Sequence, residues 1–240
     1  TAYIPQTPPP VGESIPSGSS FSAAAKDFKM PQVWRTNIAV DRRIGRNLVL
    51  TLEAIHTKMI NNVFFRNANL GDENGTVGGK LTDKPYYNTR LNSNINQMIV
   101  MDNINKGSSF SITPMIQKTY ANGWDASLAY TYTYAEDVAI GTSDQSGSAW
   151  NTNNIAFNPN RPELGYSNFS VPHRIVGNIS YRLEYLNRKM ATTFGLVYSA
   201  ASQDRYTFRY GADINGDGQS NDIMYIPANP SEIKFVEGFK

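Results

Sequence analysis

Apolar and polar residues alternate along six stretches of this chain. In the clearest stretch, Trp124, Leu128 and Tyr132 occupy one parity, whereas Asp125 and Thr131 occupy the other. Because successive side chains of a β-strand point to opposite faces, this alternation indicates strands with one apolar and one polar face. The pattern predicts almost no helix and six long antiparallel strands, near residues 32–44, 47–66, 108–119, 123–136, 169–186 and 189–211.

The connections between these strands alternate strictly in length. Tight turns are indicated at Gly45, at Asn122-Gly123 and at Asn187, whereas 67–107 and 137–168 are long and polar. Outer-membrane barrels have this asymmetry, with short periplasmic turns and long extracellular loops. We therefore expect an all-β, up-and-down antiparallel meander that forms part of a transmembrane β-barrel, with both long loops outside the cell.

This topology fixes the interpretation of Lys106-Gly107, which could otherwise be read as a turn. A turn there would place the next long loop on the short-turn side, so we expect a kink or bulge within one descending strand. The chain then divides into a loop over 1–31, the barrel segment over 32–211 and an extracellular loop region over 212–240.

Aromatic residues gather near both ends of the expected strands. Tyr120 and Trp124 flank one tight turn, and Tyr130 and Tyr134 stand toward a long loop. Such girdles mark the two interfaces of a membrane barrel. Aromatic packing in a soluble sheet is the alternative, but it does not explain the unequal connections. On the membrane interpretation, Leu128 and Ile175 face lipid.

Composition excludes several other classes. The chain has 22 Lys+Arg against 20 Asp+Glu, and this near balance of charge provides no positive electrostatic field that would attract nucleic acid. Without cysteine there are no disulfides, thiolate zinc sites or thiol catalysis. No 18-residue apolar run predicts a transmembrane helix. No leader precedes Thr1, so we expect a mature piece or an internal fragment of an outer-membrane protein.

Catalytic chemistry has little support, and we expect no enzyme. His56 and His173 are the only histidines, and no nucleophile elbow, zinc motif or phosphate loop occurs. Glu136 and Asp137 are adjacent carboxylates, but neighbours on a strand point to opposite faces.

The polar parity of the strands is the candidate transport surface. Its residues either solvate a water-filled interior, contact a plug or recognise a solute. The lumen-facing candidates are Arg35, Asn37, Asp41, Asp125, Arg174, Asn178 and Arg182.

A second candidate site is a possible weak calcium loop near the end of the chain. Asp213, Asn215 and Asp217 alternate and Gly218 follows, as in the first half of a calcium-binding loop, and Asp222 adds a carboxylate. The bidentate Glu expected at the twelfth position is replaced by Met224. A polar turn is the alternative interpretation.

Several stretches between about residues 28 and 228 resemble the barrel of TonB-dependent outer-membrane transporters of the Oar-like type found in Bacteroidota. They are Met30–Asn37, Leu52–Lys58 with Ile60–Asn62, Ala129–Tyr134, Pro172–Ile175, Asp213–Gly218 with Asn221-Asp222, and Tyr225–Pro227. The resemblance implies a 22-stranded barrel in the bacterial outer membrane, closed by a plug and driven by the TonB complex.

The chain departs from that pattern because it has no plug, no TonB-contacting segment and no terminal aromatic strand. Six strands do not close a barrel. We therefore expect a barrel fragment whose partners are outer-membrane lipid, the remaining barrel and plug, and TonB through the plug. The expected function is movement of a bulky solute, inward or outward. The alternatives are a passive porin-like or adhesin-like barrel, and a soluble β-sheet module that binds glycans.

Overall fold

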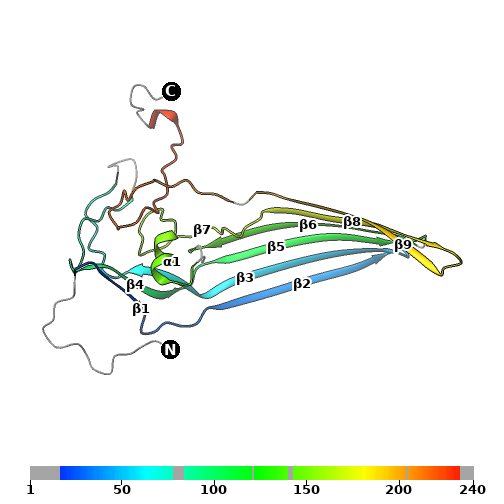
Figure 1. The fold of residues 1–240 in the computed structure, drawn as a ribbon, viewed down its shortest axis with the longest axis horizontal. Coiled ribbons are helices and arrows are strands. Elements are labelled where there is room, and N and C mark those ends of the chain that lie inside the picture. The colour runs from blue at the N-terminus through cyan, green and yellow to red at the C-terminus, as the bar shows by residue number, and fades with distance from the viewer. Residues whose placement is uncertain (1–16, 78–83, 121, 140–142, 204, 233–240) are drawn as a thin grey trace.

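The computed structural model describes residues 17–77, 84–120, 122–139, 143–203 and 205–232. Parts of the expected N-terminal, 67–107, 137–168 and C-terminal loop regions lie outside the described residues. Figure 1 shows long strands side by side, with tight turns at one end of the sheet and the helix and long loops at the other.

Six long strands form the body of the sheet, and each pairs antiparallel with the next. Five agree with the predicted ranges to within a few residues, whereas the last ends at Ala201 instead of residue 211. The strands are β2 (Gln32–Ile44), β3 (Leu48–Asn67), β5 (Ser108–Thr119), β6 (Trp124–Asp137), β8 (His173–Tyr185) and β9 (Met190–Ala201).

The expected kink at Lys106-Gly107 is confirmed. Strand β4 (Ile95–Ile104) and β5 both pair antiparallel with β3, and the partner pairs Asn62↔Ile104 and Lys58↔Ser108 keep one register. Gly107 joins the two strands at φ +116°, where a Cβ would lie 2.9 Å from the Met59 side chain. Glycine is therefore required at this bend, where the ladder is interrupted but the strand direction is kept.

The expectation of a purely antiparallel meander is wrong at one point. Strand β1 (Ser19–Ala24), in the region expected to be loop, pairs parallel with β4. The chain then crosses to β2 on the other side of β3, and Asn103 binds the backbone N–H and C=O of Lys29. Because β4 continues beyond the end of β6, β1 supplies partners to an edge that would otherwise be bare.

Three short elements complete the loop end. They are the helix α1 (Ser146–Thr152), the two-residue strand β7 (Gly165–Tyr166) paired with β6, and the 3₁₀ turn η2 (Pro230–Glu232). The first two lie in the stretch that the sequence predicted to be a long loop.

The pairing registers give the sheet one continuous apolar face. Partner residues on neighbouring strands point to the same side. The pairs Val40↔Leu52, Ile116↔Leu128 and Ile179↔Leu196 align the apolar parity within each hairpin, and Leu50↔Ile116 and Ala126↔Ile179 align the hairpins with one another. Leu128 is 51% exposed and Leu196 is 68% exposed. Such a face is stable only against lipid or another apolar surface.

The buried apolar core lies elsewhere. In the described part of the chain, the buried hydrophobic side chains other than proline all lie outside the six long strands, at the loop end: Leu70, Tyr87, Ile99, Val100, Val138, Ala149, Trp150 and Ile155. The molecule thus excludes water from its loops and leaves the apolar face of its strands open.

Candidate functional site

The seven predicted lumen residues share the polar face of the sheet. On its first two strands, Arg35 donates to the Thr57 hydroxyl over 3.2 Å, and Asn37 donates to Glu53 over 2.9 Å. The Thr51 hydroxyl donates to Asp41 over 2.5 Å. These cross-strand pairs satisfy polar groups within the sheet.

The remaining candidates belong to β6 and β8. Asp125 accepts a hydrogen bond from Thr119 over 2.8 Å, and Ser127 bonds to Asn178. Arg174 pairs in register with Thr131, and Arg182 forms an exposed ion pair with Glu184. The seven residues share a face but are distributed along β2, β6 and β8, so they line a surface and do not converge on one point.

The loop layer covers the far end of that same face. Helix α1 contacts β3 and β4. Its Trp150, 1% exposed, lines a small gap together with Phe65, which has the parity of the polar residues of β3. Gln97 of β4, close to Gly147 of the helix, shares that parity. The helix therefore packs on the polar side of the sheet and not on the apolar side.

Three separate loops are joined at a buried ion pair. Lys84 lies 2.6 Å from Asp222, and their side chains are 4% and 0% exposed. Lys84 also donates to the carbonyl of Ile155 over 2.6 Å, and Asp222 accepts the N–H of Ile214. Burial of a charged pair is tolerated here because both partners have further hydrogen bonds. The contact fixes the loops into one layer.

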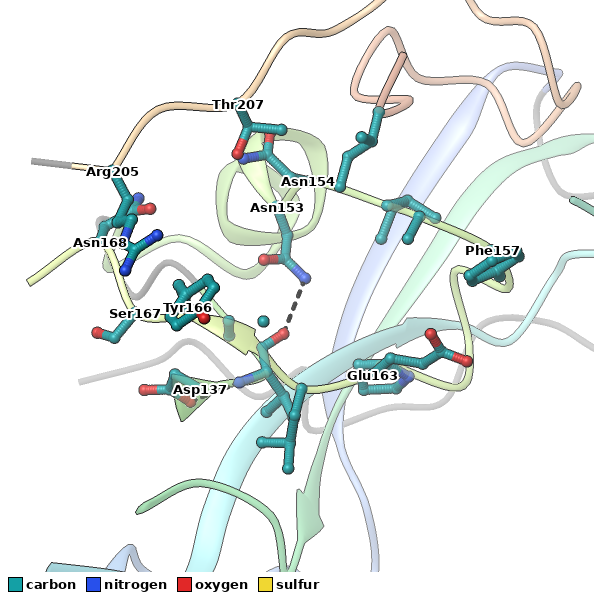
Figure 2. A pocket seen from close by; sticks show the side chains of 18 of the residues that line it. Asp137, Asn153, Asn154, Phe157, Glu163, Tyr166, Ser167, Asn168, Arg205 and Thr207 are labelled. Carbon is teal, nitrogen blue, oxygen red and sulfur yellow. Dashed lines mark hydrogen bonds between the residues drawn. The ribbon is translucent and has the colours of Figure 1, made fainter. Parts of the chain in front are cut away.

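A cavity of about 310 Å³ opens beside this junction (Figure 2). Its walls come from residues 137–139 at the end of β6, from residues 153–158 and 161–168, from residues 205–207 and from Ile223. Figure 2 shows Asn153 donating to the carbonyl of Val138 across one wall, over 3.3 Å. The cavity is placed where the strands end and the loop layer begins.

The lining of the cavity combines amides, charges and aromatic rings. The Arg205 guanidinium lies 3.9 Å from the ring centre of Tyr166, which meets Tyr134 edge-on. Asp137 accepts from Asn62 over 2.8 Å. Aromatic faces beside positively and negatively charged groups suit a polar organic ligand better than a lipid.

The predicted calcium loop folds as a network of internal hydrogen bonds. Asp213 accepts the N–H groups of Gly216 and Gly218, and Asp217 accepts the N–H of Gln219 and the Asn215 amide. Burial raises the pKa of Asp217 to about 6, although the bonds from Asn215 and Gln219 oppose the rise. This carboxylate is therefore costly to ionise.

The calcium interpretation stays a prediction. Asp222 is turned to Lys84, and no group of three or more acidic or histidine side chains among the described residues is arranged to hold a metal. The oxygens of Asp213 and Asp217 accept hydrogen bonds from backbone N–H groups of the same loop, and carboxylates that do so keep further acceptor sites.

Sequence reasoning missed the residues that build the loop layer and its cavity. Lys84 and Tyr166 stand in the long polar loops with no motif around them, and Arg205 falls near the end of the last predicted strand, where nothing in the pattern marks it as a binding residue. Nothing in their spacing could have predicted that segments 71 or more residues apart would meet, as Lys84 and Ile155 do.

Comparison with known proteins identifies the class. The family model described as an outer membrane beta barrel domain matches residues 1–229. The chain belongs to this family, and its place is the bacterial outer membrane. Neither a curated protein nor a solved structure matches the chain. In the described residues, no helix has both the length and the apolar character needed to cross a membrane.

Proposed function

We propose that this chain forms part of a TonB-dependent outer-membrane transporter that moves a bulky polar solute. On this proposal the apolar face contacts lipid and the polar face lines the interior, including Arg35, Asp125 and Arg174. The remaining strands of the barrel pair with the outer edges of β2 and β9, each of which has one neighbour in the described sheet.

The observation that carries the proposal is the loop layer on the polar side of the sheet. An open diffusion pore has no need of a packed core and a buried ion pair among its loops, whereas a gated transporter captures its solute at such a layer. The cavity beside Tyr166 and Arg205 supplies a binding surface there. Its amides and rings serve binding, and we propose no catalysis.

The resemblance to Oar-like receptors adds the energy source, because those barrels are driven through a plug by the TonB complex. A passive porin-like barrel is the competing function. The two differ in whether movement of the solute requires the proton-motive force.

The test compares the solutes in the culture medium of wild-type cells, deletion cells and cells lacking TonB. If the protein is a TonB-dependent importer, the same solutes stay unconsumed in the medium of the deletion cells, of the cells lacking TonB and of wild-type cells treated with a protonophore. If it is a TonB-dependent exporter, the same three cultures fail to release the solute. Solute movement that is lost on deletion but unaffected by TonB loss and protonophore would identify a passive barrel. Unchanged media in the deletion strain would contradict transport altogether.

A further inference from the structure

The apolar face carries a groove in the half of the sheet that is nearer the tight turns. The groove holds about 460 Å³ and lies across β2, β3, β5 and β6. Its walls include the exposed side chains of Leu52 and Leu128, and Arg42 lies at its margin. Its position on the lipid side separates it from the polar cavity of the loop layer.

Pro114 explains why the groove is there. This proline stands inside a central strand, where it has no N–H to give to a neighbour. Pairing of β5 with β3 continues through Leu52↔Pro114, whereas the pairing with β6 is interrupted between Ile112 and Met115. The compact ring between Leu52 and Tyr130 leaves a hollow that a longer side chain would fill.

The charges beside the groove are of one sign. On the apolar parity of residues 40–44, 48–52, 114–118 and 124–128, all of them described, the charged side chains are Arg42 and Lys118. Lys118 lies 4.7 Å from the ring centre of Tyr120, which borders the tight turn. Arg42 is three residues before Gly45, roughly 10 Å along the strand. Both cations therefore lie near the membrane interface.

We propose that the groove holds an acyl chain of an anionic phospholipid whose phosphate is bound by Arg42 and Lys118. An unpaired arginine on a lipid-facing strand is costly near the midplane but favourable beside a phosphate group. Because tight turns of such barrels are periplasmic, the lipid belongs to the periplasmic leaflet. The proposal rests on the membrane placement of the sheet and does not depend on TonB-driven transport.

The experiment uses the full barrel, extracted from outer membranes and gently delipidated. Native mass spectrometry measures the retention of phosphatidylglycerol, phosphatidylethanolamine and lipopolysaccharide. The variants are Arg42→Gln, Arg42→Lys and Pro114→Ile, which fills the groove. Arg43→Gln is the matched control, because Arg43 adjoins Arg42 but has the polar parity. Heat-modifiable mobility on gels establishes that each variant is folded.

The proposal expects phosphatidylglycerol to be retained in preference to the other two lipids. Arg42→Gln should lower this retention about fivefold, the effect of one interfacial charge. Pro114→Ile should also lower it, whereas Arg42→Lys and Arg43→Gln should leave it nearly unchanged. Equal retention of phosphatidylglycerol by Arg42→Gln and Arg43→Gln would show that the bound lipid is a non-specific annulus, and would overturn the proposal. Preferential loss of lipopolysaccharide would overturn the periplasmic assignment.

Discussion

At the scale of single residues, the face on which a strand side chain stands sets the cost of changing it. Leu128 belongs to the apolar face, in register with Ile116 and Gly177. Thr131, three residues along the same strand, belongs to the polar face and bonds to Thr113 over 3.0 Å. Two neighbouring positions on one strand therefore test the membrane placement.

We predict that Leu128→Arg destabilises the complete barrel by about 2–4 kcal/mol, because it places a guanidinium in lipid near the midplane. Thr131→Arg should cost much less, since its guanidinium enters the polar side. Urea unfolding of barrels refolded into lipid vesicles measures both. Equal losses of unfolding free energy would refute the division into faces.

At the scale of elements, the loops are held together by polar contacts to one another. The loop from Asp213 to Asp222 meets Tyr87 through a backbone bond from the Tyr87 N–H to the Asn215 carbonyl. At Gly216 a Cβ would lie 1.9 Å from the Tyr87 carbonyl, so the two loops approach too closely for any other residue. Burial also raises the pKa of Tyr87, with the charges of Glu73 and Asp217 adding to the effect.

We predict that this loop opens more readily as the pH rises. Asp217 has its pKa raised from 3.8 to about 6, so its protonated form is favoured in the folded loop. Its stabilising contribution is complete below pH 3.8 and is lost as the pH rises through about 6; the full difference is on the order of 3 kcal/mol. Hydrogen exchange of residues 213–222, corrected for intrinsic rates, measures the opening.

Asp217→Asn should remove this pH dependence between pH 4 and 7. The exposed Asp144 of another loop provides the control, because Asp144→Asn should leave the pH profile of residues 213–222 as it is in the wild type. A wild-type loop whose protection is flat or rises over this range would contradict the prediction.

At the scale of the whole molecule, the tight turns and the long loops lie at opposite ends of the sheet (Figure 1). We predict that the turns are periplasmic and the loops extracellular. The chain contains no cysteine, so single cysteines at Asn187 and Asp144 are specific probes within it. In intact cells an impermeant maleimide should label Asp144→Cys and spare Asn187→Cys. The opposite labelling pattern would reverse the topology.

Local alternation determined the strands, because it reports which face of each strand meets an apolar environment. The alternation alone was therefore enough to assign Leu128 and Asp125 to opposite faces. The kink at Gly107 followed from the strict alternation of short and long connections, which leaves no place for a turn there. The same reasoning placed all seven polar candidates on one face. It could not show that these seven side chains are spread over the face instead of meeting at one point, because alternation along a strand does not report the distances between side chains on different strands.

The tertiary structure alone decided the loop end. The pairing of β1 with β4 is parallel and spans distant segments, and the Lys84–Asp222 pair joins residues whose local sequence is ordinary polar loop. The hydrogen bonds that Asp213 and Asp217 accept from nearby N–H groups are also set by the folded loop. Strand periodicity is a local response to the membrane and can be read from sequence. Burial within loops depends on which distant segments come into contact, and no periodic pattern in the sequence indicates those contacts.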